Sequence, residues 1–337
     1  MGWHALRARR ELGRVRRGSP ERRPGGGPDD PAPALPRRVG GPVGGPVTLL
    51  LQVLFAGLSV GAVYALVAVG FGVVANGTGA VNFVQGEFVM LGGVMAGIVN
   101  EWLRPPLVVS LLAALAVGVA AGLLTELAAG RFSRSHNADV ITLATIGLTL
   151  VIKAVVLLAT GARTYQLPHF LGEAPLHVAG AVVDTQALWN LAVVVVVAAA
   201  LSAFFRRTRR GTILRAAADD PEMVASLGVP FRTTARWAFV LAGVLGALAG
   251  VGLAPLSVMS YDSGTLLGLK GFAAAMLGGL GNLYGALAGG LLLGLTEAVV
   301  AGYGSATYSD AVAFVVLLIV LFTRPTGLFA QRKAVRV

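Results

Sequence analysis

The sequence predicts an all-α membrane protein, a polytopic transmembrane helical bundle of about eight or nine spans. Only 13% of the residues are charged and 55% are hydrophobic, whereas a soluble domain carries roughly 25% charged residues. The chain has 46 glycines, which suit membrane helices because small residues let backbones approach closely. Its apolar residues also gather in long runs, and about 20 apolar residues are enough to span a bilayer as a helix.

Seven stretches are the strongest candidates for individual spans: 48–75, 81–100, 107–129, 139–160, 186–205, 236–256 and 309–323. The stretch 265–302 is about twice as long as one span, and glycines gather at its middle. It predicts one broken or re-entrant element, either two short spans or a hairpin. Irregular backbone at membrane depth is tolerated only inside protein or beside a cavity.

Basic residues between the apolar runs predict the orientation. Segments 130–138, 206–236 and 324–337 are rich in arginine, which marks cytoplasmic loops. Three spans precede residue 130, so the chain would start outside, with a basic arm on the unfavourable side. An extra break near Asn76–Gly79 would remove this conflict.

The arm itself, residues 1–46, holds ten arginines against four acidic residues. Its composition predicts disorder. The conflict also disappears if the natural protein starts at Val47, because bacterial genes can start at a valine codon. We expect residues 47–330 to form a single transmembrane domain and residues 331–337 a cytoplasmic tail.

Composition and charge also exclude several classes of protein. The net charge is +11, but most of it lies in the arm and beside the spans, which favours a membrane over a nucleic acid. There is no cysteine and the four histidines lack metal-ligand spacing, so we expect no metal and no cofactor. The glycine-rich Leu277–Asn282 lacks the Gly-Lys-Ser/Thr ending of a phosphate loop. We therefore expect no ATP hydrolysis by this chain and no enzyme activity.

The segment 206–236 is the most informative polar stretch. It predicts a short helix over 211–228, with a break or cap at Asp219-Asp220-Pro221 and a glycine stop at Gly228. Met223, Val224 and Leu227 would share one face. Such a helix is typical of a docking element for a soluble partner; the alternative is an ordinary loop between helices.

This segment resembles the coupling loop of branched-chain amino acid permeases in ABC importers, of the shorter, eight-span type. That family's pattern is Gly-x-x-x-Arg-Ala-x-Ala-x-Asp-x-x-x-Ala-x-x-x-Gly, and Val224 stands where it has alanine. Glu222 opens the related E-A-A-x-x-x-G pattern, in which both alanines are replaced here. The matching positions imply an ATPase-coupling helix formed by Arg215, Ala216, Asp220, Glu222, Val224 and Gly228.

Three further blocks are similar to the same family. Tyr64-Ala65-Leu66, Gly70 and 82–87 resemble Y-A-L…G…N-F-A-H-G-E, with Gln85 in place of the usual histidine. Residues 268–282 resemble G-x-K-A-F-x-A-A-V-L-G-G-x-G-S, and 324–328 match as well. The candidates for the translocation path or gating are Asn82, Gln85, Glu87, Lys270, Gly278, Gly279 and Gly281.

The sequence allows more than one role for several charged residues near the spans. We expect Glu87 either to orient the start of a helix or to line the path. Lys153, Glu126 and Glu297 lie near span ends, which favours snorkelling to the interface. Lys270 would face an anionic partner or pair with a loop carboxylate such as Asp262. The glycines 278–281 would serve close helix packing or a broken helix that lines the path.

The resemblance implies a permease subunit of an ABC importer in the bacterial cytoplasmic membrane, moving branched-chain or other small amino acids. Its implied partners are a second homologous permease, two cytosolic ATPase subunits, an extracytoplasmic binding protein and membrane lipid, with no nucleic acid. A permease for urea or short amides is the nearest alternative. An ion-coupled transporter would require carboxylates deep in several spans, and a membrane enzyme would require a polar cluster at a bilayer face.

Overall fold

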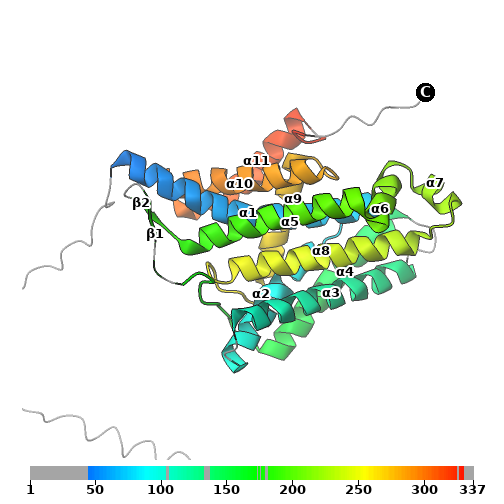
Figure 1. The fold of residues 1–337 in the computed structure, drawn as a ribbon, viewed down its shortest axis with the longest axis horizontal. Coiled ribbons are helices and arrows are strands. Elements are labelled where there is room, and N and C mark those ends of the chain that lie inside the picture. Colours follow the sequence, from blue (N-terminus) through cyan, green and yellow to red (C-terminus); the bar gives the residue numbers. More distant parts are fainter. Residues whose placement is uncertain are drawn as a thin grey trace, which may run out of the picture. The chain divides into compact units, whose positions relative to one another are not determined.

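The computed structural model describes residues 45–103, 106–132, 137–172, 174, 176–178, 181–324 and 326–329. Within these residues it confirms a bundle of long α-helices (Figure 1). The elements are α1 (Pro46–Thr78), α2 (Gln85–Leu103), α3 (Leu107–Phe132), α4 (Ala138–Thr160), β1 (Leu176–Val178), β2 (Ala181–Val183), α5 (Thr185–Arg207), α6 (Arg209–Asp219), α7 (Pro221–Ser226), α8 (Phe231–Leu253), α9 (Ser263–Gly278), α10 (Leu283–Tyr303), the 3-10 turn η1 (Ala306–Tyr308) and α11 (Ser309–Thr323). The predictions for the arm before residue 45 and for the tail 331–337 lie outside the described residues.

Seven of the helices in the described part of the chain are long and apolar enough to cross a membrane: α1, α3, α4, α5, α8, α10 and the η1–α11 segment. The predicted number of eight or nine also includes α2 and α9, which are not among those seven. Helix α2 carries Gln85 and Glu87 in its first turn, and α9 has only 16 residues. Both pack inside the bundle, against α1 and against each other.

Helix α1 is the centre of the bundle. It is 33 residues long and contacts α5, α8, α9 and α10. In its most apolar window 83% of the residues are buried, against 17% for α4 and 11% for α11. Gly57 and Gly61 lie directly against the backbone of α10, so the two helices approach more closely than larger side chains would allow.

The stretch 265–302 forms two helices, as its glycines predict. Helix α9 ends at Gly278 and α10 begins at Leu283. Between them Gly279 and Gly281 have φ angles of +97° and +93°, a conformation that favours glycine. The two helices pack against each other, so this element is a helical hairpin.

The bundle has two distinct ends. Figure 1 shows α6 and α7 at one end of the long helices and the β1–β2 hairpin at the other. In that hairpin Leu176 pairs with Val183 in antiparallel register. Near the hairpin end, the loops after α4 and after α8 meet, because Tyr165 and Met259 exchange two backbone hydrogen bonds of 2.8 Å.

Helix α1 ends on the α6–α7 side, where Gly77 lies against Leu214 of α6 and Ala238 of α8. The helix is continuous through Asn76 and ends at Gly79, whose φ is +71°. The break predicted near Asn76–Gly79 is therefore present, but it separates α1 from α2 and adds no crossing. The start of α1 lies at the opposite end from α6.

The connection 79–84 turns back into the bundle. Two of its backbone amides donate hydrogen bonds to threonine hydroxyls on α4. Val81 N–H donates to Thr142 Oγ1 (3.3 Å) and Phe83 N–H donates to Thr145 Oγ1 (3.2 Å). Val84 N–H donates to Asn82 Oδ1 at 3.1 Å. Because irregular backbone inside a membrane protein needs internal partners, these hydroxyl and amide groups allow α2 to start within the bundle.

Candidate functional site

The segment predicted as one broken helix over 211–228 forms two helices, α6 and α7, separated at Asp220. Asp220 caps α7, because its Oδ1 accepts a hydrogen bond from Met223 N–H at 2.9 Å, and Pro221 occupies the first helical position. Gly228 follows with a φ of +83°. The predicted cap and the glycine stop therefore both appear at the predicted residues.

The surface of this α6–α7 segment divides into an anchored side and an exposed side. Leu214, Ala217 and Val224 are buried, whereas Arg215, Asp220, Glu222 and Gly228 are exposed and Ala216 is half-buried. Met223 and Leu227 are also exposed, at 51% and 75%. The expectation that Met223, Val224 and Leu227 share one face is therefore wrong: Val224 points inward and the other two point outward.

Two contacts fix α6 to the membrane helices. The Arg210 guanidinium lies 4.0 Å from the centroid of the Trp237 ring on α8, within the range of a cation–π interaction. Gly211 lies against the backbone of Phe204 on α5, where a larger residue would not fit. Together with the contact between Leu214 and Gly77, these place α6 against three helices of the bundle.

The candidate residues Asn82, Gln85 and Glu87 come together at the start of α2. All three are almost fully buried. Gln85 Nε2 donates to the carbonyl of Ala242 at 3.2 Å, and Gly70 on α1 leaves room for the Gln85 amide. Ala242 is at the middle of α8, so the block lies deep in the bundle.

Several polar atoms of this block are unpaired. Among the described residues, Asn82 Nδ2, Gln85 Oε1 and both carboxylate oxygens of Glu87 have no hydrogen-bond partner. Glu87 does lie in the first turn of α2, which agrees with a role in orienting that helix. Its oxygens, however, cap no backbone amide there.

Lys270 forms a buried ionic cluster that the sequence did not predict. Its ammonium group donates to Glu297 Oε1 (2.7 Å), Asp310 Oδ1 (2.6 Å) and the Tyr64 hydroxyl (3.1 Å). The Tyr64 hydroxyl in turn donates to Glu297 Oε2 at 2.9 Å. The cluster joins α1, α9, α10 and α11.

This geometry corrects two expectations. Lys270 does not pair with Asp262, and Glu297 does not snorkel to the interface, because its side chain is only 15% exposed and is ion-paired. The sequence feature that could have predicted the cluster is the presence of a charged residue on each of three consecutive helices: Lys270 on α9, Glu297 on α10 and Asp310 on α11.

The other charges near span ends also have partners. Asp262 pairs with Lys153, whose ammonium also donates to Thr265 Oγ1 at 3.4 Å. Glu126 is buried, and its Oε2 accepts a hydrogen bond of 3.5 Å from Arg236 Nε. Glu126, which is 3% exposed, is therefore an internal ion-pair partner and not a snorkelling end, whereas Lys153 is 27% exposed and reaches the 64% exposed Asp262.

The three candidate glycines lie at the turn of the α9–α10 hairpin. Gly278 packs against the backbone of Gly285 and Gly289, which agrees with close helix packing. The carbonyl of Gly281 accepts a hydrogen bond of 2.7 Å from Asn76 Nδ2 on α1. Gly279 lies against Gly327, after α11.

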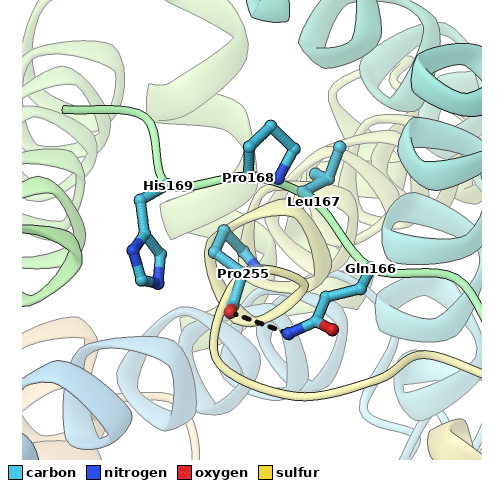
Figure 2. Close-up of a pocket in the computed structure, with 5 residues that line it drawn as sticks. All are labelled: Gln166, Leu167, Pro168, His169 and Pro255. Atoms are coloured by element: carbon cyan, nitrogen blue, oxygen red, sulfur yellow. Dashed lines mark hydrogen bonds between the residues drawn. The ribbon is translucent and has the colours of Figure 1, made fainter. Parts of the chain in front are cut away.

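A pocket of about 390 Å³ opens on the end away from α6–α7. Figure 2 shows its five lining residues, which come from the loops after α4 and after α8. They are Gln166, Leu167, Pro168, His169 and Pro255. Gln166 Nε2 donates to the carbonyl of Pro255 at 3.3 Å and so ties the two loops together.

Comparison with known proteins identifies the family. The family described as branched-chain amino acid transport system / permease component matches residues 53–321. The LivH high-affinity branched-chain amino acid transport system permease protein of Salmonella typhimurium is 31% identical over 304 residues, covering 85% of this chain and 97% of LivH. The corresponding BraD protein of Pseudomonas aeruginosa is 33% identical over 302 residues, covering 85% and 98%.

A solved structure, PsaBC from Streptococcus pneumoniae in complex with Fab, gives a TM-score of 0.45 at 16% identity, covering 82% of this chain and 92% of that one. The apolar helices and the family match make the chain a multi-pass protein of the cytoplasmic membrane. It belongs to the branched-chain amino acid transport system permease family.

Proposed function

We propose that this chain is the transmembrane permease subunit of an ABC importer for branched-chain or other small amino acids. Family membership and the names of LivH and BraD support this function. Separate ATPase subunits would supply the energy. The transmembrane domain would cover residues 47–330, with 206–236 as its cytoplasmic coupling loop.

The observation that carries the proposal is the geometry of the α6–α7 segment. Its outer side presents Arg215, Glu222, Met223 and Leu227 to solvent, while Leu214 and Val224 anchor its inner side. A mixed charged and apolar surface on a short, anchored helix is suited to docking a soluble partner. A push on this surface would be transmitted to α1 and α8, which α6 contacts directly.

The two distinct ends of the bundle support an assembly with a different partner at each end. Two cytosolic ATPase subunits would dock at the α6–α7 end, one on this chain and one on a second, homologous permease. An extracytoplasmic binding protein would deliver the substrate at the end that carries the 390 Å³ pocket and the β1–β2 hairpin. Membrane lipid would surround the outer helices, such as α4.

A charge reversal tests the coupling role. In the assembled complex, Glu222→Lys and Gly228→Val should reduce leucine uptake into proteoliposomes by about tenfold, because losing one good interface contact is worth about that factor. Less ATPase should co-purify with the tagged chain. The matched control is Glu101→Lys, which reverses an exposed charge on α2, outside the α6–α7 segment.

Two results would overturn the proposal. One is unchanged co-purification and unchanged uptake in both α6–α7 variants. The other is leucine uptake by this chain alone in liposomes under an ion gradient, which would indicate an ion-coupled transporter. Correct insertion of the variants is checked by their elution from size-exclusion chromatography.

A further inference from the structure

Glu87 occupies an unusual position for a carboxylate. Helix α2 begins deep in the bundle, where Gln85 bonds to the carbonyl of Ala242 at the middle of α8. Glu87 follows two residues later and is 1% exposed. An ionisable side chain at this depth in a membrane protein is costly and is usually functional.

The described part of the chain offers Glu87 no hydrogen-bond donor for either carboxylate oxygen. Lys153 and Asp262 are the charged side chains close enough to act on it electrostatically, and these two pair with each other. A first-turn position gives some help from the helix dipole, but less than the cost of burying an unpaired carboxylate. Glu87 therefore requires a bound proton, a cation or a hydrogen-bond donor, and these residues provide no hydrogen-bond donor.

Glycines of α9 and α2 surround the Glu87 carboxylate. Gly264, at the start of α9, faces the carboxylate, and a Cβ there would lie only 2.7 Å from Glu87 Oε2. The neighbouring Gly86 packs against the backbone of Gly264 and Gly268, so α2 and α9 approach closely here. Two further unpaired polar atoms, Gln85 Oε1 and Asn82 Nδ2, belong to the same block.

The Lys153–Asp262 pair connects this block to the surface. The Asp262 side chain is 64% exposed and that of Lys153 is 27% exposed, whereas Glu87 is enclosed. Asp262 precedes α9 directly, in the loop that bonds to Tyr165 at the end away from α6–α7. A solute that enters from that end therefore meets the Lys153–Asp262 pair before it reaches Glu87.

From these observations we propose that Glu87 binds the ammonium group of the transported solute. An ammonium group supplies both the positive charge and the three donors that the carboxylate lacks. The site selects a solute with a free amino group and disfavours uncharged urea or amides. This inference rests on the proposed importer function and deepens it.

The test compares Glu87→Gln with Glu101→Gln in the complete complex, reconstituted with its ATPases, second permease and binding protein. The probes are leucine and urea. Glu87→Gln should lower leucine uptake at least tenfold, while ATPase co-purification and the ATPase rate stay within twofold of the unsubstituted complex. Glu101→Gln, an exposed position on the same helix, should leave uptake unchanged.

The outcomes separate the two claims. If the unsubstituted complex takes up no leucine, the proposed function fails. If it does take up leucine but Glu87→Gln keeps uptake within twofold, the inference fails and the function stands, because glutamine mimics a neutral, purely structural carboxylic acid. Equal uptake of urea by the unsubstituted complex would also overturn the inference.

If Glu87→Gln does not assemble, a second variant tests ammonium binding at Glu87. Gly264→Ala keeps the charge of Glu87 but places a methyl group against its carboxylate. We expect the KM for leucine to rise at least fivefold with the maximal rate retained. An unchanged KM in an assembled complex would refute ammonium binding at Glu87.

Discussion

The ionic cluster around Lys270 predicts a large loss of stability from a single substitution. Lys270→Met keeps much of the length of the side chain and removes its charge. The lysine side chain is 5% exposed, and its partners Glu297 and Asp310 are 15% and 57% exposed. The substitution thus leaves one buried carboxylate, that of Glu297, without its counter-ion.

The magnitude follows from this difference in burial. Removing one partner of a buried ion pair typically costs about 3 to 5 kcal/mol, and this range applies to the Lys270–Glu297 pair. An exposed pair contributes at most about 1 kcal/mol, so Asp310→Asn should cost about that much. The double variant Lys270→Met/Glu297→Gln removes both charges and should recover part of the loss, because no unpaired charge stays buried.

The assay is the free energy of unfolding in mixed micelles, measured by titration with sodium dodecyl sulfate and followed by circular dichroism. The order of stability should be unsubstituted chain, Asp310→Asn, double variant, Lys270→Met. The reasoning is refuted if Lys270→Met loses no more than Asp310→Asn. It is also refuted if the double variant is less stable than Lys270→Met.

Two further substitutions test the packing of the glycines and of α6. Gly278→Leu should lose about 3 kcal/mol or more in the same titration, because the new side chain overlaps the backbone of Gly285. Gly147→Leu is its control, since no described atom lies within 4 Å of a Cβ there, and an equal loss in both would contradict the packing argument. Arg210→Ala should loosen α6 by about 1 kcal/mol through loss of its contact with Trp237. Hydrogen exchange of the α6 amides would show this as faster exchange than in Arg209→Ala, and equal rates in the two variants would be evidence against the contact.

The membrane helices were largely predictable from the sequence because hydropathy is a local property. The predicted span 107–129 became α3 (Leu107–Phe132), and 139–160 became α4 (Ala138–Thr160). The largest shift is in α8, predicted at 236–256 and observed at Phe231–Leu253. Its first turn carries Arg232, a charge that placed the predicted start of the span later although the residue is part of the helix.

The partners of the charged residues were not predictable in the same way. Position along a helix indicated that Glu297 and Glu126 could reach the interface, but it did not show which neighbouring helix each one faces. Glu297 pairs with Lys270, which is 27 residues away in the sequence, and Glu126 pairs with Arg236, which is 110 residues away. Such pairs depend on how the helices pack, which a single sequence without structural information does not contain.

The buried position of Glu87 could have been inferred in part from the sequence around the connection between α1 and α2. Six residues separate α1 from α2, and such a short connection normally lies outside the bilayer. This one folds inward because hydroxyl groups on α4, Thr142 and Thr145, accept hydrogen bonds from its amides. Two threonines one turn apart within an apolar span are a modest signal by themselves. Combined with the requirement that backbone amides at membrane depth need internal partners, they argue that such a loop is built into the bundle and holds the start of α2, and Glu87 with it, inside the protein.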